Sequence, residues 1–361
     1  MSSAVLLTTS KNGCSKRYFQ GFCPIDQTKK AVGELVFSTG MTGYVESLTD
    51  PSYRRQILTF TYPLIGNYGV PPKEDWESDR VQASGVIVAE PSFVPNHAAS
   101  TQSLLEWLKE QDVPIMWGVD TRALTKVLRD EGSSFGAFCV KKSSEKTPPD
   151  LETLLQPPFG EERDLIAEVS TKTPYRIGSG DKTIIAVDCG IKRNILRSLS
   201  ARGLRILVVP YDYDYTNDPA DGIFLSNGPG NPKSATKTIK VLRKALKQDR
   251  PIFGICLGAQ LMALAAGGTT YKLRFGHRGH NQPCFDHTQN RAILTAQNHG
   301  WAIDPESLPL DWEVHFTSLN DGSVEGIMHR KKPHVAVQFH PESAPGPNDA
   351  RYLFGAFVES L

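Results

Sequence analysis

The chain has 361 residues, enough for two domains, and 39% of them are hydrophobic, which suffices for ordinary cores. Its 40 Lys and Arg residues balance 39 Asp and Glu residues, so a formal charge of +1 gives no overall field that attracts nucleic acid or an acidic membrane. No apolar run approaches the roughly 18 residues that cross a bilayer. The six cysteines are irregularly spaced without a CxxC pair, as in reduced cytosolic proteins. We therefore expect a cytoplasmic protein with no nucleic-acid or membrane partner, although Ser and Lys near the N-terminus leave a weak organellar presequence open.

The first part of the chain gives weak secondary-structure signals. Short apolar runs predict strands at 33–40, 55–63 and 84–90. Amphipathic spacing with Ser, Thr or Gly at the ends predicts helices at 100–111 and 121–132. From pattern alone this part is an α/β or β-rich domain.

A segment rich in Pro, Ser, Lys and Glu, residues 141–182, separates this part from a more regular second half. That composition is typical of a connection between domains, with room for one short helix. We therefore divide the chain into a first domain at 1–145, a connection at 146–180 and a second domain at 181–361.

The second domain alternates apolar strands with amphipathic helices. Predicted strands lie at 183–188, 204–210, 221–226, 251–255 and 334–339. Predicted helices lie at 191–203, 238–248, 257–268 and 348–360. This alternation predicts an α/β fold built on a doubly wound, mostly parallel sheet.

One cysteine stands between two glycines where a predicted strand meets a predicted helix, in the run Gly254-Ile255-Cys256-Leu257-Gly258. A nucleophile on such a sharp turn needs small neighbours, as in the G-x-S-x-G elbow of hydrolases. A helix N-terminus favours a thiolate and directs N–H groups at an oxyanion that forms beside the sulfur. On this motif alone, a small buried cysteine without chemistry stays an equal alternative.

A thiol nucleophile needs an imidazole base and a group that orients it. His340 and Glu342 follow the last predicted strand, and side chains two residues apart in an extended segment lean to the same side. The carboxyl edge of the sheet, where Cys256 is also expected, is where α/β folds bind ligands. Singly, the two are interpreted as a surface histidine and a solvated acid; together with the elbow they favour a Cys–His–Glu triad.

Two glycines flank a proline in LSNGPGNP, residues 225–232, after the third predicted strand of this domain. Gly228 and Gly230 permit close approach of the backbone to a ligand and offer N–H donors. By itself, a tight turn is the simpler interpretation of the motif.

Potential metal ligands gather in FGHRGHNQPCFDH, residues 275–287. They are His277, His280, Cys284 and His287. Their spacing matches no zinc template, and a glycine between the histidines predicts a loop rather than a ligating helix, so we expect no metal. No G-x-x-x-x-G-K-[ST] motif occurs in the sequence, so we expect no nucleotide site and no cofactor in this chain.

The motifs also resemble a known family. The runs GICLGAQLMALAAGG, NGPGNP, QNHGWAID and VAVQFHPESAPGPNDA are similar to those of class I (triad-type) glutamine amidotransferase domains. In the first half, GELVFSTGMTGYVESLTDPSYRRQILTFTYPLIGNYGVP and GVDTRALTKVLRDEGS resemble the N-terminal domain of the carbamoyl phosphate synthetase small subunit. The resemblance covers nearly the whole chain, and the first-half motifs are the more specific.

The resemblance implies that the chain hydrolyses glutamine to glutamate and ammonia. Cys256 would attack the side-chain amide, His340 would move protons and Glu342 would orient the imidazole, while the N–H groups of Leu257 and Gly228 would form the oxyanion hole. The glutamine-binding positions implied by the family are Ser52, Gly228, Gly230, Leu257, Gln260, Asn298, Gly300 and Trp301. Two positions depart from the family pattern: Trp301 replaces a common Phe, and His280 stands near an expected small residue.

The resemblance also implies a partner. Ammonia from L-glutamine would pass to a carbamoyl phosphate synthetase domain or large subunit, which uses bicarbonate, ATP and Mg²⁺. We favour the amidotransferase domain of a eukaryotic multifunctional pyrimidine-biosynthesis enzyme, with an arginine-pathway small subunit as the alternative. A non-catalytic docking subunit and an uncoupled cysteine hydrolase, such as a peptidase or γ-glutamyl hydrolase, also remain open. The sequence decides neither the effectors, the oligomeric state nor the activity without a partner.

Overall fold

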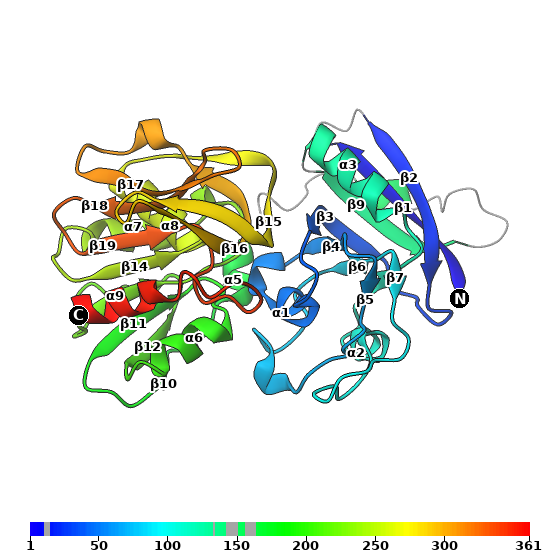
Figure 1. Cartoon of the computed structure of the whole chain (residues 1–361), viewed down its shortest axis with the longest axis horizontal. Helices are drawn as coiled ribbons and strands as arrows, with labels where there is room; N and C mark the ends of the chain where they lie inside the picture. The colour runs from blue at the N-terminus through cyan, green and yellow to red at the C-terminus, as the bar shows by residue number, and fades with distance from the viewer. Residues whose placement is uncertain (11–14, 133, 142–150, 156–163) are drawn as a thin grey trace. The chain divides into compact units, whose positions relative to one another are not determined.

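The computed structural model of the chain describes residues 1–10, 15–132, 134–141, 151–155 and 164–361 (Figure 1). It divides into two compact units, Met1–Glu162 and Arg163–Leu361. Both units combine helices with strands, so the predicted α/β class is confirmed. Part of the predicted connection at 146–180 lies outside the described residues.

The first unit is built around a seven-stranded sheet in the order β2-β1-β9-β3-β4-β6-β8. Its strands are β1 (Ser2–Ser10), β2 (Lys16–Cys23), β3 (Ala31–Ser38), β4 (Gln56–Phe60), β6 (Gly85–Ile87), β8 (Ile115–Met116) and β9 (Ser134–Val140), with a separate pair β5 (Leu64–Ile65) and β7 (Glu90–Pro91). Its helices are α1 (Tyr44–Thr49), η1 (Pro51–Tyr53), η2 (Lys73–Asp75), α2 (Leu104–Glu110), α3 (Thr121–Glu131) and α4 (Leu151–Leu154). The three predicted strands and two predicted helices of this unit all form; β3 begins and ends two residues earlier than predicted, and the other four are shorter than their predicted ranges.

The second unit has a ten-stranded sheet in the order β10-β12-β11-β13-β14-β19-β18-β16-β15-β17. Its strands are β10 (Tyr175–Ile177), β11 (Thr183–Asp188), β12 (Arg205–Pro210), β13 (Gly222–Leu225), β14 (Ile252–Ile255), β15 (Thr270–Asp286), β16 (Arg291–Ile303), β17 (Trp312–Ser318), β18 (Val324–His329) and β19 (His334–Val337). Its helices are α5 (Leu165–Val169), α6 (Arg193–Ser200), η3 (Pro232–Ser234), α7 (Thr236–Ala245), α8 (Leu257–Ala266), η4 (Pro305–Ser307) and α9 (Tyr352–Ser360). The run from β12 through β11, β13 and β14 to β19 is parallel, and the strands from β18 to β17 add an antiparallel extension.

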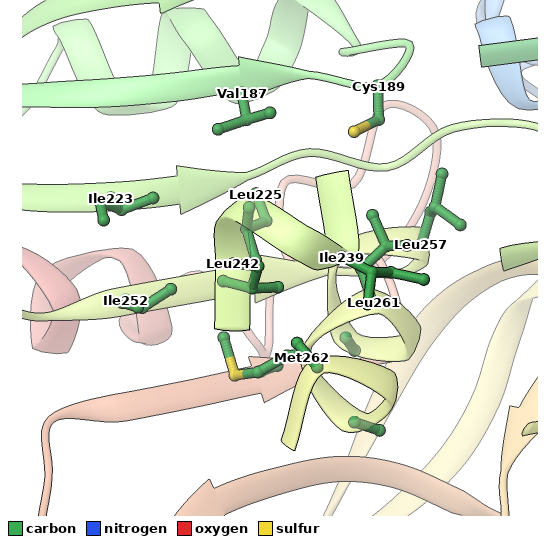
Figure 2. Packing of buried hydrophobic residues seen from close by; sticks show 14 of the residues in the cluster. Val187, Cys189, Ile223, Leu225, Ile239, Leu242, Ile252, Leu257, Leu261 and Met262 are labelled. Carbon is green, nitrogen blue, oxygen red and sulfur yellow. The ribbon is translucent and has the colours of Figure 1, made fainter. Parts of the chain in front are cut away.

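The parallel part of this sheet is covered on both faces because its strands alternate large apolar side chains between two cores. Figure 2 shows one of them, in which Ile223 and Leu225 of β13 pack with Leu242 of α7 and Leu261 of α8. Between those two β13 residues, Phe224 points into the other core, which α6 and α9 cover. This is the doubly wound arrangement that the sequence predicts, and it brings the loops after the parallel strands to one edge.

The prediction of a loop within 275–287 is wrong. Residues 275–286 belong to β15, which pairs with β16 in an antiparallel ribbon. The ribbon has register shifts between Lys272 and His277 and between Gly279 and Gln282. The glycines and polar residues that suggest a loop therefore lie in an irregular strand, whose bulges accommodate them.

The helices of the described residues include none that is both long and apolar enough to span a membrane.

Candidate active site

Cys256 occupies a sharp turn between β14 and α8. It is the N-cap residue of α8, its φ of 54° and ψ of −104° are strained for a residue with a side chain, and it is only 2% exposed. Its N–H donates to the Val337 carbonyl at 2.8 Å, which ties the turn to β19. Burial of Cys256 and this hydrogen bond hold the strained backbone in place, as in the nucleophile elbow of hydrolases.

The two glycines of the elbow are needed because backbone lies against them. A Cβ added to Gly254 would lie 2.9 Å from the carbonyl carbon and oxygen of Gly258. A Cβ added to Gly258 would lie 2.4 Å from the Leu225 carbonyl oxygen on β13. Neither contact can be relieved by rotating a side chain, so α8 can approach the sheet this closely only with glycine at both positions.

We expect Gly258→Ala to lower the free energy of unfolding by about 1–3 kcal/mol, the usual cost of overpacking a rigid site. The matched control is Gly355→Ala in α9, where an added Cβ would meet nothing within 4 Å. Because alanine favours helix over glycine, that variant should be unchanged or about 0.5–1 kcal/mol more stable. Urea unfolding of both variants measures the difference, and equal stabilities would contradict the close approach of α8 to β13.

His340 and Glu342 lie in the loop after β19 and form a buried pair. The ring Nδ1 of His340 lies 2.7 Å from Oε1 of Glu342, and the two residues are 4% and 0% exposed. Burial lowers the pKa of His340, but the charge of Glu342 and the nearby Cys256 outweigh it and raise this pKa from 6.5 to about 10. His340 Nε2 has no hydrogen-bond partner among the described residues, so this nitrogen is left to exchange protons on the Cys256 side.

Lys192 is a part of the site that the sequence analysis misses. Its Nζ lies 2.9 Å from Glu342 Oε1 and donates to the Ser343 carbonyl at 2.7 Å, and its side chain is 4% exposed. Burial raises the pKa of Glu342, but Lys192 and His340 outweigh it and hold this pKa at about 2. Glu342 therefore stays a carboxylate, which is the state that orients an imidazolium.

Gln338 is a second missed residue, and it connects two predicted ones. Its Nε2 donates to Cys256 Sγ at 3.7 Å, and its Oε1 accepts from Gln260 Nε2 at 3.1 Å. Gln260 also donates to the Trp301 carbonyl at 2.9 Å, and the Asn298 carbonyl accepts from Cys256 Sγ at 3.6 Å. The predicted residues of α8 and β16 thus gather around the sulfur.

Gly228 and Gly230 lie in the loop after β13, beside the same edge. A Cβ on Gly228 would lie 2.1 Å from the Cys189 carbonyl oxygen and 2.8 Å from a methyl of Leu257, and Gly230 has a φ of 92°. Glycine is therefore required at Gly228 by close approach and at Gly230 by its left-handed backbone. As the first residue of α8, Leu257 has an N–H that no earlier turn of the helix can pair, as an oxyanion donor requires.

The remaining predicted residues are placed as follows. Gly300 lies on β16, where an added Cβ would come 3.3 Å from Nη2 of the buried Arg278. The ring of Trp301, which replaces the more common Phe, lies 6.0 Å from Lys272 Nζ. Ser52 belongs to the first unit, is 8% exposed, and donates its N–H to Asp50 Oδ1 at 2.8 Å, so its role in glutamine binding stays a prediction.

The histidines of β15 do not gather as the sequence groups them. Of the four potential metal ligands between 275 and 287, only His277 belongs to a cluster of ligand atoms in the described part of the chain, together with His299 and Glu325. The pKa of His280 is lowered to about 4 by burial, with Lys192 and His340 adding to the effect, so this ring is neutral beside the triad.

Two families match the chain. Residues 185–360 match the class-I glutamine amidotransferases, and residues 15–138 match the CPSase domain of the carbamoyl-phosphate synthase small chain. The parallel sheet with its cysteine elbow is thus a class-I glutamine amidotransferase domain.

Three relatives are similar over most of the chain. The arginine-specific small chain of carbamoyl phosphate synthase from Emericella nidulans is 46% identical over 342 residues, which cover 91% of this chain and 74% of the relative. The multifunctional protein pyr-3 of Neurospora crassa is 44% identical over 95% of this chain and 20% of the relative, and the multifunctional protein CAD of Squalus acanthias is 46% identical over 91% and 15%. The chain belongs to the carbamoyl phosphate synthase small-chain family, and it spans a fifth or less of the length of the two multifunctional relatives.

Proposed function

We propose that the chain is the glutamine-hydrolysing component of a carbamoyl phosphate synthase. The observation that carries this proposal is the buried Cys256–His340–Glu342 arrangement at the carboxyl edge of the parallel sheet. The thiolate of Cys256 attacks the side-chain amide carbon of L-glutamine, and the N–H groups of Leu257 and Gly228 stabilise the oxyanion. His340 gives a proton to the departing ammonia, which leaves a glutamyl thioester on the sulfur.

Water completes the cycle. Neutral His340 takes a proton from the water that attacks the thioester, and breakdown of this second tetrahedral intermediate returns the thiolate and releases glutamate. Glu342 supports the imidazolium in both halves of the reaction, and Gln338 and Asn298 fix the position of the sulfur.

The ammonia would then be consumed by a synthetase. Ammonia is largely protonated at neutral pH, so we propose that it passes through an internal channel to a synthetase domain or large subunit, which combines it with bicarbonate using ATP and Mg²⁺. We place the reaction in pyrimidine biosynthesis, with an arginine-pathway small subunit as the alternative, since relatives of both kinds are similarly identical. A cytoplasmic setting agrees with the free thiols of Cys23, Cys189, Cys256 and Cys284.

The proposal is tested by measuring glutamate release from glutamine by the purified chain, alone and with a cognate synthetase. We expect slow release by the chain alone and strong stimulation by the synthetase, because the partner aligns a restrained site. Release of amino acids from peptides without a partner would instead favour an uncoupled hydrolase. Absence of turnover under both conditions, with the synthetase still bound, would reveal a docking subunit.

A further inference from the structure

A buried cluster of titratable side chains lies next to the Asn298–Trp301 segment of β16. It consists of His277, His299, Asp321 and Glu325. Glu325, on β18 and 0% exposed, accepts through Oε1 from His277 Nδ1 at 3.3 Å and lies 3.5 Å from His299 Nε2. The other nitrogen of His277, Nε2, lies 2.9 Å from Asp321 Oδ2. The cluster joins β15, β16 and β18 through side chains, and the proposed mechanism makes no use of it.

A carboxylate without solvent contact is costly unless a cation and hydrogen bonds compensate it. His277 hydrogen-bonds Glu325 Oε1, to which Ser323 Oγ also donates at 3.4 Å, and its other ring nitrogen faces Asp321. Burial lowers the pKa of His277, but Glu325 and Asp321 outweigh it and raise this pKa. Because each ring nitrogen of His277 faces a carboxylate oxygen, we interpret the cluster as an ion-pair network rather than as a metal site.

The cluster lies where the backbone ladder is least regular. The β15–β16 pairing shifts register on both sides of the directly paired His277 and His299, and β16 pairs with β18 only through Ile303 and Val324 among the described residues. Side-chain contacts to Glu325 therefore provide the cross-strand connection that regular hydrogen bonding does not. Removing the charge should loosen β16 without unfolding the sheet.

The cluster connects to the sulfur through one short path of side-chain contacts. His299 Nδ1 donates to the Trp301 carbonyl at 2.9 Å, and the same carbonyl accepts from Gln260, which holds Gln338 against the Cys256 sulfur. The main-chain carbonyl of Glu325 also accepts from the Gln338 N–H at 2.8 Å, a backbone contact that a substitution of the Glu325 side chain leaves in place.

We propose that Glu325 is a positioning residue of the glutaminase site, which fixes His277 on β15 and faces His299 on β16, so that the neighbouring Asn298–Trp301 segment is preset for glutamine. This inference rests on the proposed function, because glutamine is the ligand that the segment would receive. Glu325 touches neither substrate nor sulfur, so its removal should weaken glutamine binding more than it slows the chemical step.

The test compares Glu325→Gln with wild type in steady-state glutaminase assays of the full chain with its synthetase. The amide keeps the shape and one acceptor but removes the charge, so we expect KM for glutamine to rise about tenfold, with kcat within about twofold. The conservative Glu325→Asp should recover part of the loss, which a purely volume-dependent role would not predict. Glu313→Gln is the matched control. Glu313 lies on the neighbouring strand β17, is partly exposed and forms an ion pair with Arg330 at 2.9 Å.

The outcomes separate the two proposals. An inactive wild type refutes the proposed function itself. If the wild type is active, an unchanged KM in Glu325→Gln refutes positioning by Glu325. A lower kcat with a lower melting temperature and no rise in KM also refutes it, because that result is general destabilisation. Elemental analysis closes the remaining alternative: stoichiometric zinc in wild type that is lost in Glu325→Gln would replace the ion-pair network by a metal site.

Discussion

Replacing Cys256 by serine should reduce glutamine-dependent glutamate release by at least about a thousandfold, because a hydroxyl at this elbow is a far weaker nucleophile than a thiolate. The change is nearly isosteric at a residue that is 2% exposed, so the fold and the contact with Gln338 should be retained. Carbamoyl phosphate synthesis from added ammonium salt by the complex should therefore continue at the wild-type rate. Parallel assays with glutamine and with ammonium measure the two rates on one preparation.

Cys284→Ser is the matched control for this prediction. Cys284 is a fully buried cysteine of the same unit, and its sulfur contacts Thr295 and Gln297 on the antiparallel ribbon rather than the triad. The same chemical change at this position should leave glutamine-dependent activity within a few-fold of wild type. Retained activity in Cys256→Ser, or an equal loss in Cys284→Ser, would overturn the assignment of the nucleophile.

The parallel half of the second unit could be predicted from sequence because its strands are buried on both faces. The run 183–188 coincides with β11, and the other predicted parallel strands differ from the structure by a residue or two at their ends. Such strands are continuous apolar runs bounded by turn residues, which is a strong local signal. The segment 275–287 is predicted as a loop because glycines and polar residues interrupt its pattern, and most of it forms the irregular part of β15, where register shifts accommodate these residues.

Some residues of the candidate site could be predicted from the sequence, and others could not. Cys256, His340 and Glu342 stand in local motifs, and the structure places them at one edge of one sheet. Lys192 and Gln338 carry no motif that marks chemistry: Lys192 reaches the carbonyl of Ser343, 151 residues away, and Gln338 is one polar residue in an apolar strand end. For Gln338 the sequence signal is a polar residue inside an otherwise apolar run, which is costly to bury without a partner, whereas Lys192 is followed by Arg193 and Asn194 and has no such signal.

Lys192 gives the largest expected effect on stability. Its ammonium group and the Glu342 carboxylate form a pair whose side chains are 4% and 0% exposed, and removing one member of such a pair typically costs about 3–5 kcal/mol. Lys192→Met keeps most of the apolar stem but leaves Glu342 with His340 alone. We expect the melting temperature of the second unit to fall by roughly 10 °C, given about 2–4 °C per kcal/mol for a unit of this size.

Two further variants decide whether charge is the cause. Lys237→Met makes the same chemical change in an exposed pair, Lys237 with Asp212 at 3.0 Å, and should leave the melting temperature unchanged. The double variant Lys192→Met with Glu342→Gln removes both charges, so it should be more stable than Lys192→Met, although it stays inactive because the amide cannot support an imidazolium. If the double variant were instead less stable than either single one, the loss would come from packing around the Lys192 stem. Glu342 would then be held as a carboxylate by His340 rather than by this buried cation.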